Sequence, residues 1–123
     1  MLTKIIVYYY DPLRAQLKNF LFSHIIKECM EKNDTVITEN HHSQHGWHLI
    51  LQDNDNNITD INCLIFSPNT IRGYRADIFY LQEYLYEHED TYSLDYLNSC
   101  RYTNNAPIYI FNDEGVIGEW NIN

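Results

Sequence analysis

An uninterrupted apolar and aromatic run from Lys4 to Tyr10 opens the hydrophobic pattern of the chain. A run without alternating polar positions is typical of a strand that is covered on both faces, so we place this strand centrally in a sheet. Asp11 and Pro12 then supply an N-cap and a first-turn proline. The apolar residues that follow recur at helical spacing and predict one long helix over about residues 12–31: Leu13, Leu17, Phe20, Leu21, Ile25 and Cys29.

Alternating apolar and polar positions predict strands in the segments after this helix. Gly46 to Gln52 and Thr59 to Phe66 alternate with period two, and residues 53–57 between them are Asn and Asp, which suit a hairpin turn. A short strand is expected over residues 35–38. Residues 108–111 and 116–122, separated by a turn that ends in Gly115, predict a terminal hairpin.

Two shorter helices are expected between these hairpins. Ile78, Leu81 and Leu85 stand at helical spacing and predict a helix over about residues 76–89, and Leu94 and Leu97 predict another over about 93–101. The element order indicates a single α+β domain over residues 1–123. Its sheet is expected to be mixed or antiparallel, with about five or six strands and the long helix packed on it.

Charge is distributed unevenly along the chain. Residues 1–45 carry five basic and five acidic side chains, whereas residues 46–123 carry three basic and twelve acidic ones, so the net charge of -9 lies entirely in the second part. Such a field attracts basic partners and repels nucleic acids and anionic membranes. We therefore expect a protein partner with a basic surface, and neither direct nucleic-acid binding nor membrane binding.

The segment 74–102 combines seven tyrosines with six carboxylates. Tyrosine buries a large area at low conformational cost and keeps a hydroxyl for hydrogen bonding, and carboxylates beside it add electrostatic steering. On the predicted helix over 76–89, Tyr80, Glu83, Tyr84 and Glu87 share one face. The candidate partner-binding residues are Tyr80, Glu83, Tyr84, Glu87, Glu89, Asp90, Tyr92, Asp95 and Tyr96.

Several other groups of residues have side chains that can bind metals or act in catalysis. The group His41, His42, His45 and His48 is either a transition-metal site or part of a solvated loop, and it has no cysteine or carboxylate at a ligand spacing. The Asp53-x-Asp55-x-Asn57 run resembles the start of a calcium loop but lacks the glycine and the glutamate that such a loop needs. No activated nucleophile signature is present, and acidic pairs on helices are mostly solvated. We expect no catalytic residue, no cofactor and no metal.

Cysteine usage bears on the compartment. The three cysteines are odd in number, widely spaced and form no Cys-x-x-Cys pair, which is typical of reduced thiols. No leader-like segment and no apolar run long enough to cross a bilayer is visible. The expected location is the cytoplasm of a bacterium or of a phage-infected host cell.

The thirteen residues from Ile71 to Glu83 resemble a stretch of the large terminase subunits, the ATPases that package phage DNA. In that family an Arg-Gly…Asp run precedes an apolar strand that ends in Asp-Glu. The resemblance implies a buried strand over Asp77 to Gln82, whereas the helical spacing predicts a helix there. Gln82 stands where the family has its magnesium-binding aspartate, and this chain has no Gly-x-x-x-x-Gly-Lys loop to hold phosphates, so ATP hydrolysis is not expected.

These features together predict a small, acidic binding protein that inhibits a basic, nucleic-acid-acting partner. Two settings fit equally well: a phage anti-defence protein of the anti-CRISPR type, whose partner is a CRISPR effector, and an immunity protein, whose partner is a nuclease toxin. The alternatives are a degenerate or truncated relative of the packaging ATPases and a small enzyme of another class.

Overall fold

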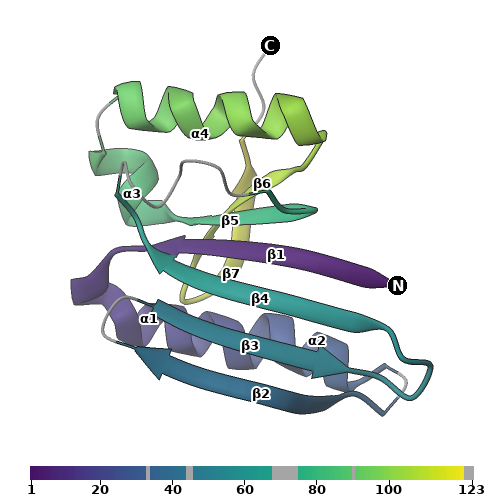
Figure 1. Cartoon of the computed structure of the whole chain (residues 1–123). Coiled ribbons are helices and arrows are strands. Elements are labelled where there is room, and N and C mark those ends of the chain that lie inside the picture. The colour runs from purple at the N-terminus through teal and green to yellow at the C-terminus, as the bar shows by residue number, and fades with distance from the viewer. Residues whose placement is uncertain (33, 44–45, 68–74, 90, 121–123) are drawn as a thin grey trace.

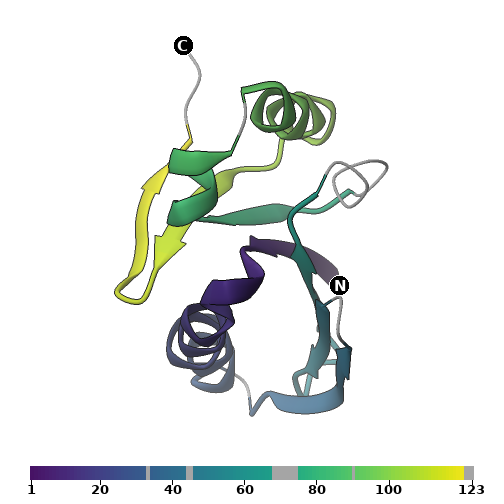
Figure 2. The same ribbon diagram turned by 90° about the vertical axis from the view of Figure 1, so that its left-hand side faces the viewer.

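The protein has an α+β fold built on a seven-stranded mixed sheet in the order β2-β3-β4-β1-β5-β6-β7 (Figure 1). The computed structural model describes residues 1–32, 34–43, 46–67, 75–89 and 91–120, without the side chains of 91–92 and 100–104. Helices cover both faces of the sheet (Figure 2). The mixed sheet and the α+β class agree with the expectation from the sequence.

Strand β1 (Leu2–Tyr9) lies in the middle of the sheet. It pairs in parallel with β4 (Ile58–Ile65) on one side and β5 (Ile78–Gln82) on the other. Every residue from position 5 to position 9 is buried, because odd-numbered side chains enter one core and even-numbered side chains the other. The central position predicted from its continuous apolar run is confirmed.

The predicted long helix is confirmed as a continuous helical run over residues 11–30. It consists of η1 (Asp11–Leu13), α1 (Arg14–Phe20), η2 (Leu21–Ile26) and α2 (Lys27–Met30). Segment η2 is π-helical, which the apolar spacing did not indicate. Five buried side chains of this run share a core with the odd-numbered face of β1: Leu17, Phe20, Leu21, Ile25 and Ile26.

Helices α3 (Glu83–His88) and α4 (Thr91–Asn104) lie on the opposite face of the sheet (Figure 2). Leu85 and Leu97 are buried there in one apolar cluster with Ile6 and Tyr8 of β1. The helix predicted over 93–101 is confirmed and is longer at both ends. The sheet therefore separates two apolar cores.

The two hairpins are confirmed. Strand β3 (Gly46–Gln52) pairs antiparallel with β4, and in the turn between them the Asp53 carboxylate accepts hydrogen bonds from the backbone N–H groups of Asp55 and Asn57, both at 2.9 Å. Strand β6 (Ile108–Asn112) is joined to β7 (Gly115–Glu119) by a tight turn. Strand β6 also pairs in parallel with β5.

The helix predicted over 76–89 is wrong for its first half. Residues Ile78–Gln82 form strand β5, and the helix begins only at Glu83. The spacing of apolar residues misleads because β5 is buried on both faces: Phe79 and Leu81 enter the core under α3 and α4, while Tyr80 packs towards the long helix. The strand implied by the resemblance to terminases is what the structure has at this point, and it raises the strand number to seven.

Strand β2 (Val36–Ser43) is longer than the short strand expected over 35–38. It pairs antiparallel with β3, with a register irregularity between Ile37 and Glu39, and its side chains are almost all exposed. His41 and His42 therefore lie on an edge strand and not in a loop. Among the described residues, no helix has the length and apolar character needed to cross a membrane.

Candidate functional site

The strand order creates a topological switch point between β1 and β5. The two strands are parallel neighbours, so their carboxyl ends meet at the same edge of the sheet. The chain leaves β1 through the long helix on one face and leaves β5 through α3 and α4 on the other face (Figure 2). In open sheets with this arrangement, ligands bind in the crevice outside the two strand ends.

In this protein the amide of Gln82 lies at that crevice. Gln82 is fully buried at the end of β5, and its Oε1 accepts a hydrogen bond of 2.7 Å from the backbone N–H of Tyr10. Its Nε2 donates to the backbone oxygen of Leu13 at 3.3 Å and to Oε1 of Gln16 at 2.6 Å. The side chain thus joins β5 to the turn that follows β1. A neutral amide, already hydrogen-bonded on both of its atoms, occupies the position where a ligand group would enter.

Three stacked aromatic rings lie at the same edge, on the face of the sheet that carries α3. The ring of Tyr84 lies between the ring of Tyr10, at a centroid distance of 4.3 Å, and the ring of His88, at 4.1 Å. The plane of Tyr84 is inclined by 14° to that of Tyr10 and by 13° to that of His88. A hydrogen bond between the Tyr84 and Tyr10 hydroxyls, followed by their electrostatic interaction, raises the pKa of Tyr84. Nδ1 of His88 lies 3.0 Å from the backbone oxygen of Tyr84, to which it donates when it carries the proton. We call Tyr10, Tyr84 and His88 the ring stack.

Four carboxylates lie on or beside α3, which carries two of the stacked rings, and on the following helix α4. Glu83 and Glu89 are half-buried at the two ends of α3, Glu87 is exposed on α3, and Asp95 is exposed on α4. Within the described part of the chain, none of these four carboxylates forms an ion pair. Their negative charge therefore remains available at the surface, beside aromatic rings.

The structure brings together only part of the predicted binding surface. Tyr84, Glu83 and Glu87 lie together on α3, and Asp95 and Tyr96 are exposed on α4. Asp90 and the side chain of Tyr92 lie outside the described residues. Tyr80 is not on the expected face, because it belongs to strand β5 and packs on the side of the sheet that carries the long helix.

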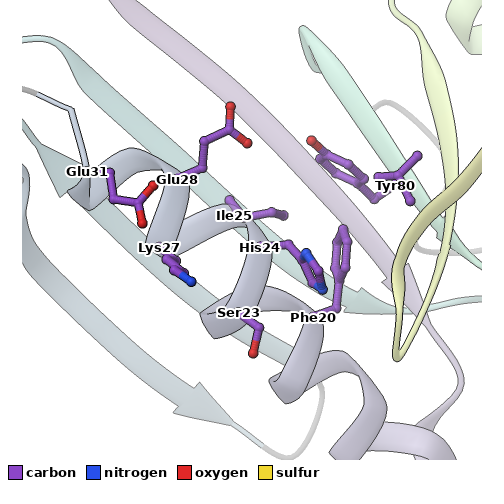
Figure 3. Close-up of a pocket in the computed structure, with 9 residues that line it drawn as sticks. Phe20, Ser23, His24, Ile25, Lys27, Glu28, Glu31 and Tyr80 are labelled. Carbon is purple, nitrogen blue, oxygen red and sulfur yellow. The ribbon is translucent and has the colours of Figure 1, made fainter.

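Tyr80 instead lines a cavity of about 300 Å³ between the long helix and the strands β5 and β7 (Figure 3). Burial is the main reason that the pKa of Tyr80 rises to about 12, with the nearby carboxylate of Glu28 as the next cause. The hydroxyl is therefore a hydrogen-bond donor at neutral pH. The lining residues are Phe20, Ser23, His24, Ile25, Lys27, Glu28, Glu31, Tyr80 and Val116.

The histidines do not gather into a metal site among the described residues. His48 pairs with Asp60 across β3 and β4, with 2.6 Å between Nε2 and Oδ1, and His41 lies 3.7 Å from the carboxylate of Glu39. His42 stacks on Trp47, and His45 lies outside the described residues. In the part of the chain that the structure describes, no three His, Cys, Asp or Glu side chains are arranged to hold an ion.

Sequence reasoning missed Tyr10 and His88 as partners of Tyr84. A signal for Tyr10 existed, since it follows the central strand directly, and residues at the carboxyl ends of parallel strands meet at one edge. With residues 78–82 predicted as a helix, the sequence shows no second strand end beside which Tyr10 could lie. His88 had no comparable signal.

By fold and site, the chain is an α+β protein with a mixed sheet and an acidic, aromatic edge at its switch point. No family model, curated protein or solved structure matches it.

Proposed function

We propose that this protein is a small acidic binding protein that inhibits a basic, nucleic-acid-acting partner. The main observation in its favour is the ring stack together with the carboxylates of α3 and α4, none of which forms an ion pair with another described residue. Aromatic rings supply contact area, and carboxylates offer to a basic groove the charge that it would find on nucleic-acid phosphates. The cytoplasm of a bacterium or phage-infected cell is the proposed location.

The chemistry at the switch point supports binding of a protein over turnover of a small molecule. The Gln82 amide uses its hydrogen-bonding atoms within the fold, and a carboxamide is a poor substitute for a carboxylate as a magnesium ligand. A partner such as a CRISPR effector or a nuclease toxin would instead meet the exposed outer surface of α3 and α4.

The experiment is capture of partners from a host lysate with the wild-type protein and with a double variant, Tyr84→Ala with Glu87→Lys. We expect a captured protein with a basic surface, whose retention falls as NaCl rises from about 0.05 M to about 0.3 M because salt screens the attraction. The double variant should no longer capture this partner protein. Glu39→Lys, which places the same charge reversal on the exposed strand β2, is the control and should retain it. Equal retention by the wild type and the double variant would show that the surface is misassigned.

A second candidate is a degenerate relative of the packaging ATPases. Strand β5 favours it, because a buried strand that ends at Gln82 and Glu83 is what the resemblance implied. This candidate predicts that magnesium and ATP together raise the melting temperature, since ligands that bind the folded state stabilise it. The binding-protein proposal predicts no such shift. A magnesium-dependent rise in the wild type would therefore favour the ATPase relative.

A further inference from the structure

Strand β7 leaves one backbone edge unpaired in the described part of the chain, because it ends the sheet and pairs only with β6. The Trp120 N–H donates to the Ile108 oxygen at 2.8 Å, towards β6. Since backbone groups alternate in direction along a strand, the neighbouring Glu119 directs its N–H and C=O groups away from β6. Ile117 lies at a register irregularity of the β6–β7 ladder, where it has no register partner. An added strand would bond to the outward groups of Glu119.

The side chains of β7 are unusually apolar for an exposed edge. Val116 is 51% exposed and Ile117 is 45% exposed. Val116 stands opposite Phe111 in the ladder, so it lies on the side of the sheet that carries the long helix, and it lines the cavity of about 300 Å³. A strand added beside β7 would direct alternate side chains to that side, next to the cavity.

The charge around this cavity selects basic side chains. Glu28 and Glu31 line it from the helix, and Glu119 belongs to the same side of the sheet because it stands opposite Tyr109, whose ring contacts Tyr80. The opposing cations are the exposed Lys27 and Lys32, of which Lys32 forms an ion pair with Glu28 at 3.3 Å. Aromatic rings beside carboxylates suit a lysine or arginine side chain.

We propose that the free edge of β7 binds an extended segment of the partner protein that carries Lys or Arg at alternate positions, with a basic side chain entering the cavity beside Tyr80. This inference takes one point from the proposed function, namely that the partner protein is basic. A second copy of the chain is a poorer occupant, because β7 has no basic residue and pairing two copies would bring Glu119 side chains near each other.

The test uses a short peptide of alternating lysine and valine and follows the backbone amides of the whole protein by NMR. We expect the peptide to shift and protect the amide of Glu119. Glu119→Pro removes an outward N–H without touching the ladder to β6, so it should weaken binding about tenfold or more relative to Glu119→Gln, which removes the charge and keeps the N–H. Glu28→Gln with Glu31→Gln should weaken binding too. The matched control is Glu39→Gln, on the opposite edge strand, which should bind as the wild type does.

Several outcomes would overturn the proposal. These are equal binding by Glu119→Pro and Glu119→Gln, amide shifts confined to α3 and α4, equal binding of a peptide with glutamate in place of lysine, and a dimer of the protein that Glu119→Pro abolishes. A folded state of Glu119→Pro is established by its unchanged amide spectrum outside β7. Loss of a captured partner in the Tyr84 and Glu87 double variant, but not in Glu119→Pro, would overturn this inference and leave the proposed function standing.

Discussion

At the scale of single residues, Gln82 connects the two halves of the fold. It is the last residue of β5, it is fully buried, and its amide reaches the turn after β1 through Tyr10, Leu13 and Gln16. Buried polar groups contribute little net stability when paired but are costly when a partner is removed. The same side chain fills the crevice where a ligand would otherwise enter.

Replacing Gln82 with leucine should therefore destabilise the protein although leucine is apolar and of similar size. The change leaves the Tyr10 N–H and the Leu13 oxygen without their partner, for an expected cost of about 2–4 kcal/mol in the free energy of unfolding. Urea unfolding measures it. Gln52→Leu is the control, since among the described residues the side chain of Gln52 bonds to the exposed Asn56 alone, and it should cost less than about 1 kcal/mol. Equal costs would contradict a structural role for the Gln82 amide.

At the scale of elements, the backbone of β3 and β4 approaches closely at Gly46. A Cβ atom added to Gly46 would lie 2.4 Å from the backbone oxygen of Cys63, which cannot move without breaking the ladder. In Gly118 of β7, by contrast, an added Cβ meets no heavy atom within 4 Å. Gly46 and Gly118 thus occupy their strands for different reasons.

Gly46→Ala should destabilise the protein by about 1–3 kcal/mol, because the new methyl group forces β3 and β4 apart. Gly118→Ala is the matched control and should change the free energy of unfolding by less than about 0.5 kcal/mol. Thermal unfolding of both variants measures the difference. If Gly118→Ala proved as costly as Gly46→Ala, general loss of glycine flexibility would be the cause and the close approach would not.

The elements show where sequence patterns succeed and where they fail. Strand β1 and the β3–β4 hairpin follow from their apolar patterns, since one is buried on both faces and the others mostly on one. Strand β5 was missed because Ile78, Leu81 and Leu85 fit helical spacing equally well. Only the neighbours β1 and β6, far away in the sequence, supply the backbone partners that make it a strand.

At the scale of the whole molecule, burial in the core beneath the long helix raises the pKa of several acids. Burial is the main cause for Tyr9, Tyr80, Cys29 and Cys63. A group whose pKa is higher in the folded state contributes stability below its unfolded pKa and loses that contribution as the pH rises through the folded pKa. The unfolded values are 9.0 for Cys and 10.0 for Tyr.

The protein should therefore lose stability progressively above about pH 9. Tyr80→Phe should reduce the loss between pH 10, the ordinary tyrosine pKa, and about pH 12, its value in the fold, because the variant has no phenol to ionise. Urea midpoints collected from about pH 8 to about pH 11 measure the slope. Tyr86→Phe, at a ring that is 41% exposed, is the control. A Tyr80→Phe slope identical to that of the wild type would contradict the burial of this hydroxyl.

The sequence alone determined the central strand, the long helix, both hairpins and the acidic, tyrosine-rich character of residues 74–102, because each depends on local spacing or composition. The tertiary structure alone decided that Tyr80 faces the long helix, that Tyr10 and His88 join Tyr84, and that Gln82 closes the crevice between β1 and β5. Apart from the contact of His88 with Tyr84, which is local to α3, these are contacts between distant segments or across the two faces of a buried strand. Such contacts depend on strand order, which no local pattern of apolar residues encodes.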